Sequence, residues 1–253
     1  YDIPQEEVEV LLPSLIVLNR LLKYTVNDSI LLSNVLLSDA VMFEMLFPKE
    51  ASFVVKAYEE FTLQSAKSIA ERFGRDLNHI SRVSSVALEI YDKMKKLHGY
   101  KLRERTLLQV SAILQDIGKY VNVKNHALLS YNTITNLDIV GINDHERLII
   151  ATVCYYHNGN IPSMDSPIYN QLSQEDRVMV SKLAAILQIS NAINTSHSPK
   201  FEQVNVNMKN GKLNIYLTTL KNINLEKWAF IAKSKLFREV YGLNAKIIKR
   251  GVL

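Results

Sequence analysis

The stretch that decides the fold is Arg103 to Lys119, RERTLLQVSAILQDIGK. A helix formed by this stretch would be apolar nearly all round, and a helix of that kind is covered by other elements of the fold. We therefore expect the central helix of a helical bundle, running from about Arg103 to Ile117, with Asp116 at its end. The apolar positions are Leu107, Leu108, Val110, Ala112, Ile113 and Leu114.

The sequence on either side predicts further long helices. Gly74 marks the end of one helix, and Asn143 with Glu146 forms a capping box that opens another. Ser173 is a helix N-cap, with Glu175 following it in the first turn. The predicted helices cover residues 51–73, 76–97, 143–157 and 173–194.

The two ends of the chain differ from this pattern. At the N-terminal end we expect a helix over 5–23 that Pro13 kinks or restarts, a strand at 29–36 and a helix over 38–47. Near the C-terminus, alternation around Asn210-Gly211 predicts a β-hairpin with a type I′ turn, followed by a helix over 225–240 and a strand at 245–248. The fold class is mainly α, with segments 1–49, 50–198 and 199–253.

Composition excludes several classes of protein. The 253 residues are 47% hydrophobic and 22% charged, which is typical of a globular chain with a real core. A single cysteine, Cys154, excludes an internal disulfide framework and a multi-cysteine zinc site. The run from Leu11 to Leu22 is too short and too interrupted to span a membrane. The acidic N-terminal end does not look like a signal peptide, so we expect a cytoplasmic protein.

Charge is distributed unevenly along the chain. Residues 1–60 contain 4 Lys and Arg against 10 Asp and Glu, whereas residues 200–253 contain 11 against 3. Two functional interpretations remain open: a polyanion-binding surface, or docking and self-association between opposite charges. A solvated lysine-rich face is the ordinary alternative.

Histidines and one aspartate are the candidates for chemistry. His79 is predicted beside the apolar stripe of its helix, and His157 closes a later helix. Asp116 at a helix C-terminus opposes the helix dipole, at a cost of about 0.3–1 kcal/mol, so it needs Lys119, a metal or a hydrogen-bond donor. His126 follows shortly after. Arg82, Lys119 and Arg147 could add charge-assisted donors for phosphate.

Each candidate also has an ordinary structural interpretation. His79 can be a satisfied helix histidine, and Asp116 can simply pair with Lys119 one turn away. His126 and His157 can be loop and helix-end histidines. The basic residues can be surface charges, and His98 and His145 are expected on the surface.

The arrangement resembles the HD phosphohydrolase superfamily, whose histidines and aspartates hold a divalent metal. More specifically, nearly the whole chain is similar to the C-terminal half of an exopolyphosphatase/guanosine-pentaphosphate phosphohydrolase (Ppx/GppA) protein. The resembling stretches are 76–83, 111–119, 126–131 with 136–138, 141–147, 155–157 and 237–242.

The resemblance implies an HD-like helical domain, preceded over 1–49 by the end of an actin-like phosphatase lobe. The catalytic part of that lobe, where magnesium is expected, lies outside this chain. Gln115 stands where the superfamily has the histidine of its His-Asp pair, and Asn191 or Asn194 stands in place of a late aspartate. We therefore expect no working metal centre, no cofactor and no catalytic residue here, although weak metal binding could remain.

The first functional interpretation is a module that binds and positions polyphosphate or another polyanion and supports a homodimer. Its site would comprise His79, Arg82, Asp116, Lys119, His126, Arg147 and His157. The alternative is an independent metal-dependent phosphohydrolase acting on a nucleotide or phosphate ester through His79, Asp116, His126 and His157. A nucleic-acid binder is unlikely, because nothing beyond charge supports it, and no membrane association is expected.

Overall fold

The computed structural model describes residues 5–25, 41–42, 45–46, 52–196, 198, 200–201, 203–209 and 211–251. The chain divides into two compact units, 1–53 and 54–253. In the first unit, α1 (Gln5–Tyr24) continues through Pro13 without a restart. Most of the strand and helix predicted at 29–36 and 38–47 lies outside the described residues, although 41–42 and 45–46 are helical.

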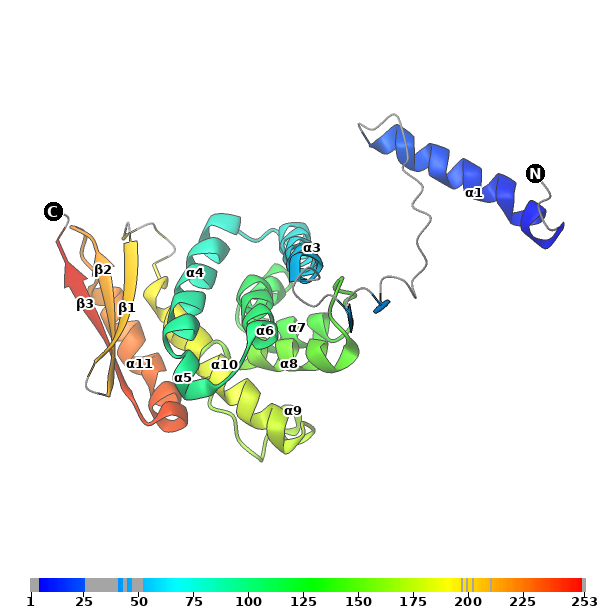
Figure 1. The fold of residues 1–253 in the computed structure, drawn as a ribbon. Helices are drawn as coiled ribbons and strands as arrows, with labels where there is room; N and C mark the ends of the chain where they lie inside the picture. Colours follow the sequence, from blue (N-terminus) through cyan, green and yellow to red (C-terminus); the bar gives the residue numbers. More distant parts are fainter. Residues whose placement is uncertain are drawn as a thin grey trace. The chain divides into compact units, whose positions relative to one another are not determined.

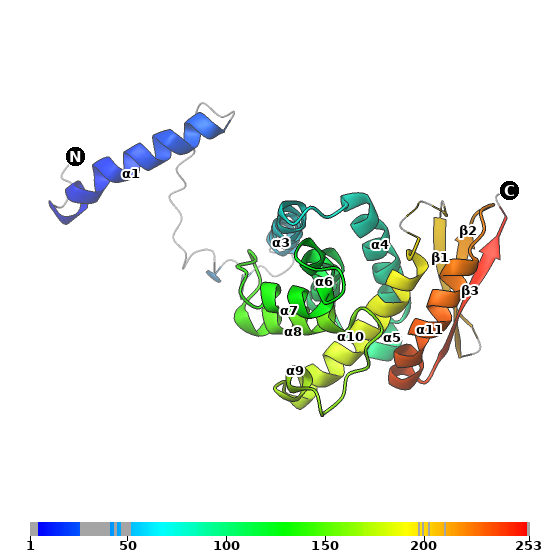
Figure 2. The same cartoon turned by 180° about the vertical axis from the view of Figure 1, so that it is seen from behind.

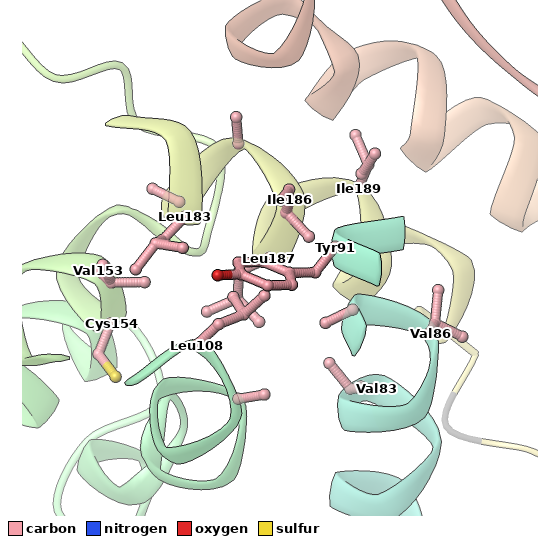
Figure 3. Packing of buried hydrophobic residues seen from close by; sticks show 14 of the residues in the cluster. Val83, Val86, Tyr91, Leu108, Val153, Cys154, Leu183, Ile186, Leu187 and Ile189 are labelled. Atoms are coloured by element: carbon pink, nitrogen blue, oxygen red, sulfur yellow. The ribbon is translucent and has the colours of Figure 1, made fainter. Parts of the chain in front are cut away.

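The second unit is built around α6 (Leu102–Leu114), which the sequence placed at the centre. All six of its predicted apolar positions are buried. Figure 3 shows side chains from α4, α6, α8 and α10 meeting in this core. The surrounding helices are α3 (Ser52–Arg72), α4 (Leu77–Lys93), α5 (Lys95–His98), α7 (His126–Ile134), α8 (Asp144–Tyr156), α9 (Pro167–Asn170) and α10 (Gln174–Ile193).

Local side-chain hydrogen bonds explain where several helices begin. Asn143 Oδ1 accepts from the Glu146 backbone N–H at 2.9 Å, and Glu146 Oε2 accepts from the Asn143 N–H at 3.2 Å, which confirms the predicted capping box. Glu146 also binds the guanidinium of Arg103, whose Nε lies 2.6 Å from Oε1. This ion pair joins the first turns of α6 and α8.

The C-terminal part forms a three-stranded sheet. Strands β1 (Gln203–Lys209) and β2 (Lys212–Thr218) are antiparallel and paired from 203↔218 to 209↔212, which confirms the hairpin. Helix α11 (Asn224–Tyr241) then leads to β3 (Asn244–Arg250), which runs parallel to β2. In Figures 1 and 2, α11 lies between α10 and the sheet. The predicted class, mainly α with a small α+β part, is confirmed.

Several boundaries differ from the prediction. The helix predicted over 76–97 breaks at Met94, whose N–H bonds to both the Ile90 and the Tyr91 carbonyl, and a short α5 follows. The central helix ends at Leu114, and a 3₁₀ turn, η1 (Ile117–Tyr120), follows. Helices α7 and α9 were not predicted. The predicted segments 50–198 and 199–253 both fall in the second compact unit. The predicted boundary between these two segments stays a prediction.

None of the described helices has both the length and the apolar character needed to cross a bilayer.

Candidate functional site

Asp116 lies at the junction between α6 and η1, and not in the last turn of the central helix as predicted. Its side chain is only 9% exposed, and Lys119 donates a hydrogen bond from Nζ to Oδ2 at 2.7 Å. Of the three kinds of partner that the sequence suggested for Asp116, the structure therefore shows the lysine. The other carboxylate oxygen, Oδ1, is turned toward two histidines.

His126 begins α7, and His157 follows the last residue of α8. Their Nε2 atoms lie 3.6 Å and 3.3 Å from Asp116 Oδ1, and the ring centroids are 5.2 Å apart. Each ring contacts a backbone carbonyl through its other nitrogen: His126 Nδ1 lies 2.7 Å from Val123 O, and His157 Nδ1 lies 2.5 Å from Cys154 O. Both imidazoles are buried and held in place from behind.

A close contact between η1 and α7 brings Asp116 and His126 together. The Gly118 N–H donates to Ser130 Oγ, which donates in turn to the Gln115 carbonyl, both at 2.9 Å. A Cβ at Gly118 would overlap with the His126 carbonyl oxygen and the Ser130 nitrogen. Only glycine allows this approach. Gly118 is therefore required for the positions of Asp116, His126 and His157, which we call the cluster.

His79 lines a hollow of about 200 Å³ beside the cluster. Asp116 and Gln115 form part of its wall, and Arg75, also in the lining, donates from Nη1 to the Asp116 carbonyl at 3.5 Å. A larger hollow of about 400 Å³ shares Ile80 and Ile113 with the first one. Its polar lining consists of Lys67, Ser81, Ser84, Ser85 and Gln109.

Lys233 of α11 was not among the sequence candidates. Its Cγ lies 3.8 Å from where a Cβ on Gly159 would be, two residues after His157, so its stem passes over the end of α8. Burial lowers the pKa of Lys233, while the charge of Asp116 raises it and that of Lys119 lowers it. Lys119 therefore binds the Asp116 carboxylate directly, and Lys233 responds to the charge of that carboxylate.

The electrostatics of the cluster follow from burial and charge. Burial alone would raise the pKa of Asp116, but His157 and Lys119 outweigh it and hold that pKa well below its usual range. Burial lowers the pKa of His126, and the electrostatic effects of His157 and Lys119 act in the same direction, against the hydrogen bond to Val123 and the charge of Asp116. At neutral pH Asp116 is therefore an anion and His126 a neutral imidazole.

The structure brings five predicted residues to one place: His79, Asp116, Lys119, His126 and His157. Arg147 pairs with Asp144 at 2.9 Å and Asp138 at 3.9 Å and is not among the residues that line the hollow, so its part in the site stays a prediction. Arg82 lies on α4 but is not among the residues that line the hollow.

Other sequence expectations concern residues around this cluster. His145 is exposed as expected, but His98 is buried, with its ring against Tyr91 and Tyr100. Asn194 donates from Nδ2 to the Ser190 carbonyl at 3.3 Å within its own helix. No spacing in the sequence indicated Lys233, because its proximity depends on how α11 packs on the bundle.

Among the residues that the structure describes, Asp116, His126 and His157 form a group that could hold a metal ion, since one ligand atom from each lies within 4.8 Å of the others. One carboxylate and two imidazoles form a donor set that suits zinc and similar cations.

A comparison with protein families agrees with this arrangement of helices and with the ordered motifs. The model of "Ppx/GppA phosphatase, domain III" matches residues 63–236, which is more than half of the chain. The chain belongs to the Ppx/GppA phosphatase family. The match begins in α3 and ends in α11, so the Ppx/GppA region includes all the residues of the cluster, Lys233 among them.

Proposed function

We propose that this Ppx/GppA chain binds and positions polyphosphate for an exopolyphosphatase-type hydrolase, without carrying out the hydrolysis itself. The observation that supports this most strongly is the Lys119 ammonium bound to the buried cluster of Asp116, His126 and His157, with the stem of Lys233 over the end of α8. Asp116 is bound by the Lys119 ammonium, and its charge also acts on Lys233 of α11. The local excess of positive charge favours an anion, and phosphate oxygens accept charge-assisted hydrogen bonds from such groups.

The shape of the neighbouring surface supports a polymeric ligand. The hollow at His79 adjoins the larger one, whose polar lining consists of serine hydroxyls, Gln109 and one lysine, Lys67. Hydroxyl and ammonium donors can bind successive phosphates without a fixed chain length. A polyphosphate end in the cluster could therefore continue between α3, α4 and α6.

The test is equilibrium binding of long-chain polyphosphate to Lys233→Met and Lys235→Met variants. Both variants remove one lysine charge from α11, but Lys235 is 61% exposed and pairs with Glu239. We expect Lys233→Met to weaken binding about tenfold and Lys235→Met to leave it within twofold. Equal effects would place the polymer on the basic surface and contradict the proposed site.

The absence of catalysis is tested on the same protein. Incubation with polyphosphate and magnesium should release no orthophosphate above the level of a heat-denatured sample. Turnover that is lost in His157→Gln would instead support the alternative, a metal-dependent phosphohydrolase.

We also propose that the chain forms a homodimer through α11. Trp228 and Ile231 on this helix are 71% and 74% exposed, and Leu225 adds to the apolar face. Exposed apolar groups of this size are typical of protein–protein contacts. Sedimentation analysis should show a dimer for the unmodified chain and a monomer for Ile231→Glu. Val140→Glu, at a loop residue that is 59% exposed, is the control and should remain dimeric.

A further inference from the structure

The three-stranded sheet has one face that is turned away from α11, which we call the outer face. Alternate residues of a strand point to opposite faces of a sheet. The inner face is apolar, with Val206, Leu213 and Ile215 buried, and α11 lies on that side (Figures 1 and 2). On the outer face every residue of the three strands is exposed or half-buried. The outer face is therefore open to solvent in the part of the chain that the structure describes.

The outer face is rich in cations and amides. The strand pairing orders its residues in rows: Lys209, Lys212 and Asn244; Asn207, Asn214 and Lys246; Asn205, Tyr216 and Ile248; and Gln203, Thr218 and Arg250. Four of these side chains are basic, five carry an amide, and none is acidic. Tyr216 and Ile248 form an apolar centre between the two rows that contain lysines and the row that contains Arg250.

The positive charge of the outer face is not compensated by ion pairs. Within the described part of the chain, no carboxylate lies at ion-pair distance from its basic side chains, which are Lys209, Lys212, Lys246 and Arg250. Arg250 instead lies over the ring of Tyr216, with its guanidinium carbon 3.7 Å from the ring centroid. Uncompensated cations on one surface attract a polyanion, and the ring and guanidinium add flat groups at its centre.

We infer that the outer face binds single-stranded nucleic acid. The bases of a single strand stack on aromatic rings and guanidinium planes, while basic side chains contact the phosphates. Tyr216 and Arg250 provide the stacking groups. Residues two apart on a strand are about 6.6 Å apart, so Lys246 lies about 7 Å and Lys212 about 13 Å along the sheet from the row of Tyr216. Phosphates on either side of a stacked base can therefore each meet a cation.

The amides favour nucleic acid over polyphosphate as the ligand of this face. Phosphate oxygens only accept hydrogen bonds, so polyphosphate would use the NH₂ groups of Asn205 and Asn214 and leave their carbonyl oxygens without a donor. The edges of bases carry both donors and acceptors and can pair with both ends of an amide. The ring of Tyr216 likewise contributes to stacking with a base and offers nothing comparable to a chain of charged groups.

This inference departs from the sequence-based expectation that nucleic acid is not a partner. That expectation rested on the absence of any signal beyond charge. The signal is invisible along the chain because Tyr216 comes from β2, its stacking partner Arg250 from β3, and amides such as Asn205 from β1. The inference goes beyond the proposed polyphosphate function and does not rest on it.

The test is fluorescence anisotropy of the full chain with labelled short single strands of RNA and of DNA, both of mixed sequence. We expect Tyr216→Ala to weaken binding about tenfold. Tyr58→Ala is the matched control, since Tyr58 is 54% exposed on α3, and should change binding less than twofold. Lys246→Met should reduce the slope of log affinity against log salt by about 0.7, the value for one phosphate contact on a single strand, whereas Lys235→Met should not.

Three results would overturn the inference: no binding of either strand by the unmodified chain at low salt, equal effects of Tyr216→Ala and Tyr58→Ala, or a duplex of the same sequence that binds as tightly as the single strand. Photochemical cross-linking of 4-thiouridine RNA to the unmodified chain needs no variant to fold. It should attach RNA to β2 or β3, and attachment only elsewhere would contradict the proposed face.

Polyphosphate binding by the same variants separates this inference from the proposed function. We expect Tyr216→Ala to leave polyphosphate binding within twofold and Lys233→Met to leave RNA binding within twofold. If Tyr216→Ala weakened both ligands equally, the outer face would be a polyphosphate surface and the inference would be wrong. Failure of polyphosphate to bind at all, with RNA binding still dependent on Tyr216, would overturn the proposed function alone.

Discussion

Asp116 is the residue on which the charge balance of the cluster depends. It is the acidic member beside His126, His157, Lys119 and Lys233. A carboxylate whose pKa is lowered in the folded state stabilises that state above the pKa of the unfolded chain, about 3.9. The contribution disappears as the pH falls below about 5 toward the folded-state value.

Asp116→Asn should therefore lower the free energy of unfolding at pH 7 by about 1–3 kcal/mol, because it leaves Lys119 without its buried partner. The difference between the variant and the unmodified chain should shrink as the pH falls from 5 to 3. Urea unfolding at several pH values measures this. A difference that stays constant across that range would show that the charge of Asp116 plays no part.

Cys154 gives a second prediction at this scale. Burial raises the pKa of its thiol well above the ordinary value, and the nearby charge of Asp116 acts in the same direction. The thiol also donates a hydrogen bond to the Ser111 carbonyl at 3.3 Å. The thiolate is the reactive form. A thiol reagent at pH 8 should therefore label Cys154 only as fast as the chain unfolds, and immediately in denaturant. Rapid labelling of the native chain would contradict this burial.

Part of the residue-level chemistry could be predicted from sequence. The position of Asp116 near a helix end required a partner, and Lys119 one turn later is that partner. The position of Lys233 beside the end of α8 could not be predicted, because it depends on how α11 packs on the bundle and not on a local sequence pattern. Arg147 pairs instead with Asp144, one helical turn away, and that local ion pair could have been expected from the spacing of the two residues.

At the scale of elements, the contact of η1 with α7 determines whether the cluster forms. Gly118 allows the two backbones to approach, and Ser130 links the Gly118 N–H to the Gln115 carbonyl. This contact fixes the start of α7, where His126 lies. Its hydrogen bonds are buried and therefore costly to leave unmade.

Gly118→Ala should destabilise the fold by about 2 kcal/mol or more, because the methyl group would overlap with backbone atoms that cannot rotate away. It should also weaken polyphosphate binding, since His126 must move. Gly251→Ala, where the added methyl group meets open space, is the control and should change neither quantity. Chemical denaturation and the binding assay together test this. An unchanged midpoint for Gly118→Ala would mean that the approach is not needed.

Elements with strong local signals agreed with the prediction. The capping residues Asn143 and Ser173 marked the starts of α8 and α10, and Asn210-Gly211 marked the hairpin. The elements that were missed depend on packing. Helix α7 is short and anchored by Ser130 to η1, and the parallel pairing of β3 with β2 depends on where α11 returns the chain.

At the scale of the whole molecule, the basic C-terminal region has two distinct parts. The stem of Lys233 passes over the end of α8 at Gly159, whereas Lys235 and Lys249 are exposed charges, the first in a surface ion pair. Exposed charges act over the Debye length, about 10 Å at 0.1 M salt, and are screened as salt rises. Under the proposed function, the exposed lysines would attract a polyanion and the cluster would position its end.

Long-chain polyphosphate should consequently lose more affinity between low and high salt than tripolyphosphate, because the longer polymer carries more charges that can contact exposed lysines. Titrations at several salt concentrations measure both slopes. Equal slopes would show that the exposed charges do not take part.

The most direct test of the account is a crystal structure of the chain with tripolyphosphate. We predict a phosphate group within hydrogen-bond distance of Lys119 and Lys233, beside His126 and His157. A tripolyphosphate bound only to exposed lysines of α11 or β3, with the cluster unchanged, would contradict the central claim.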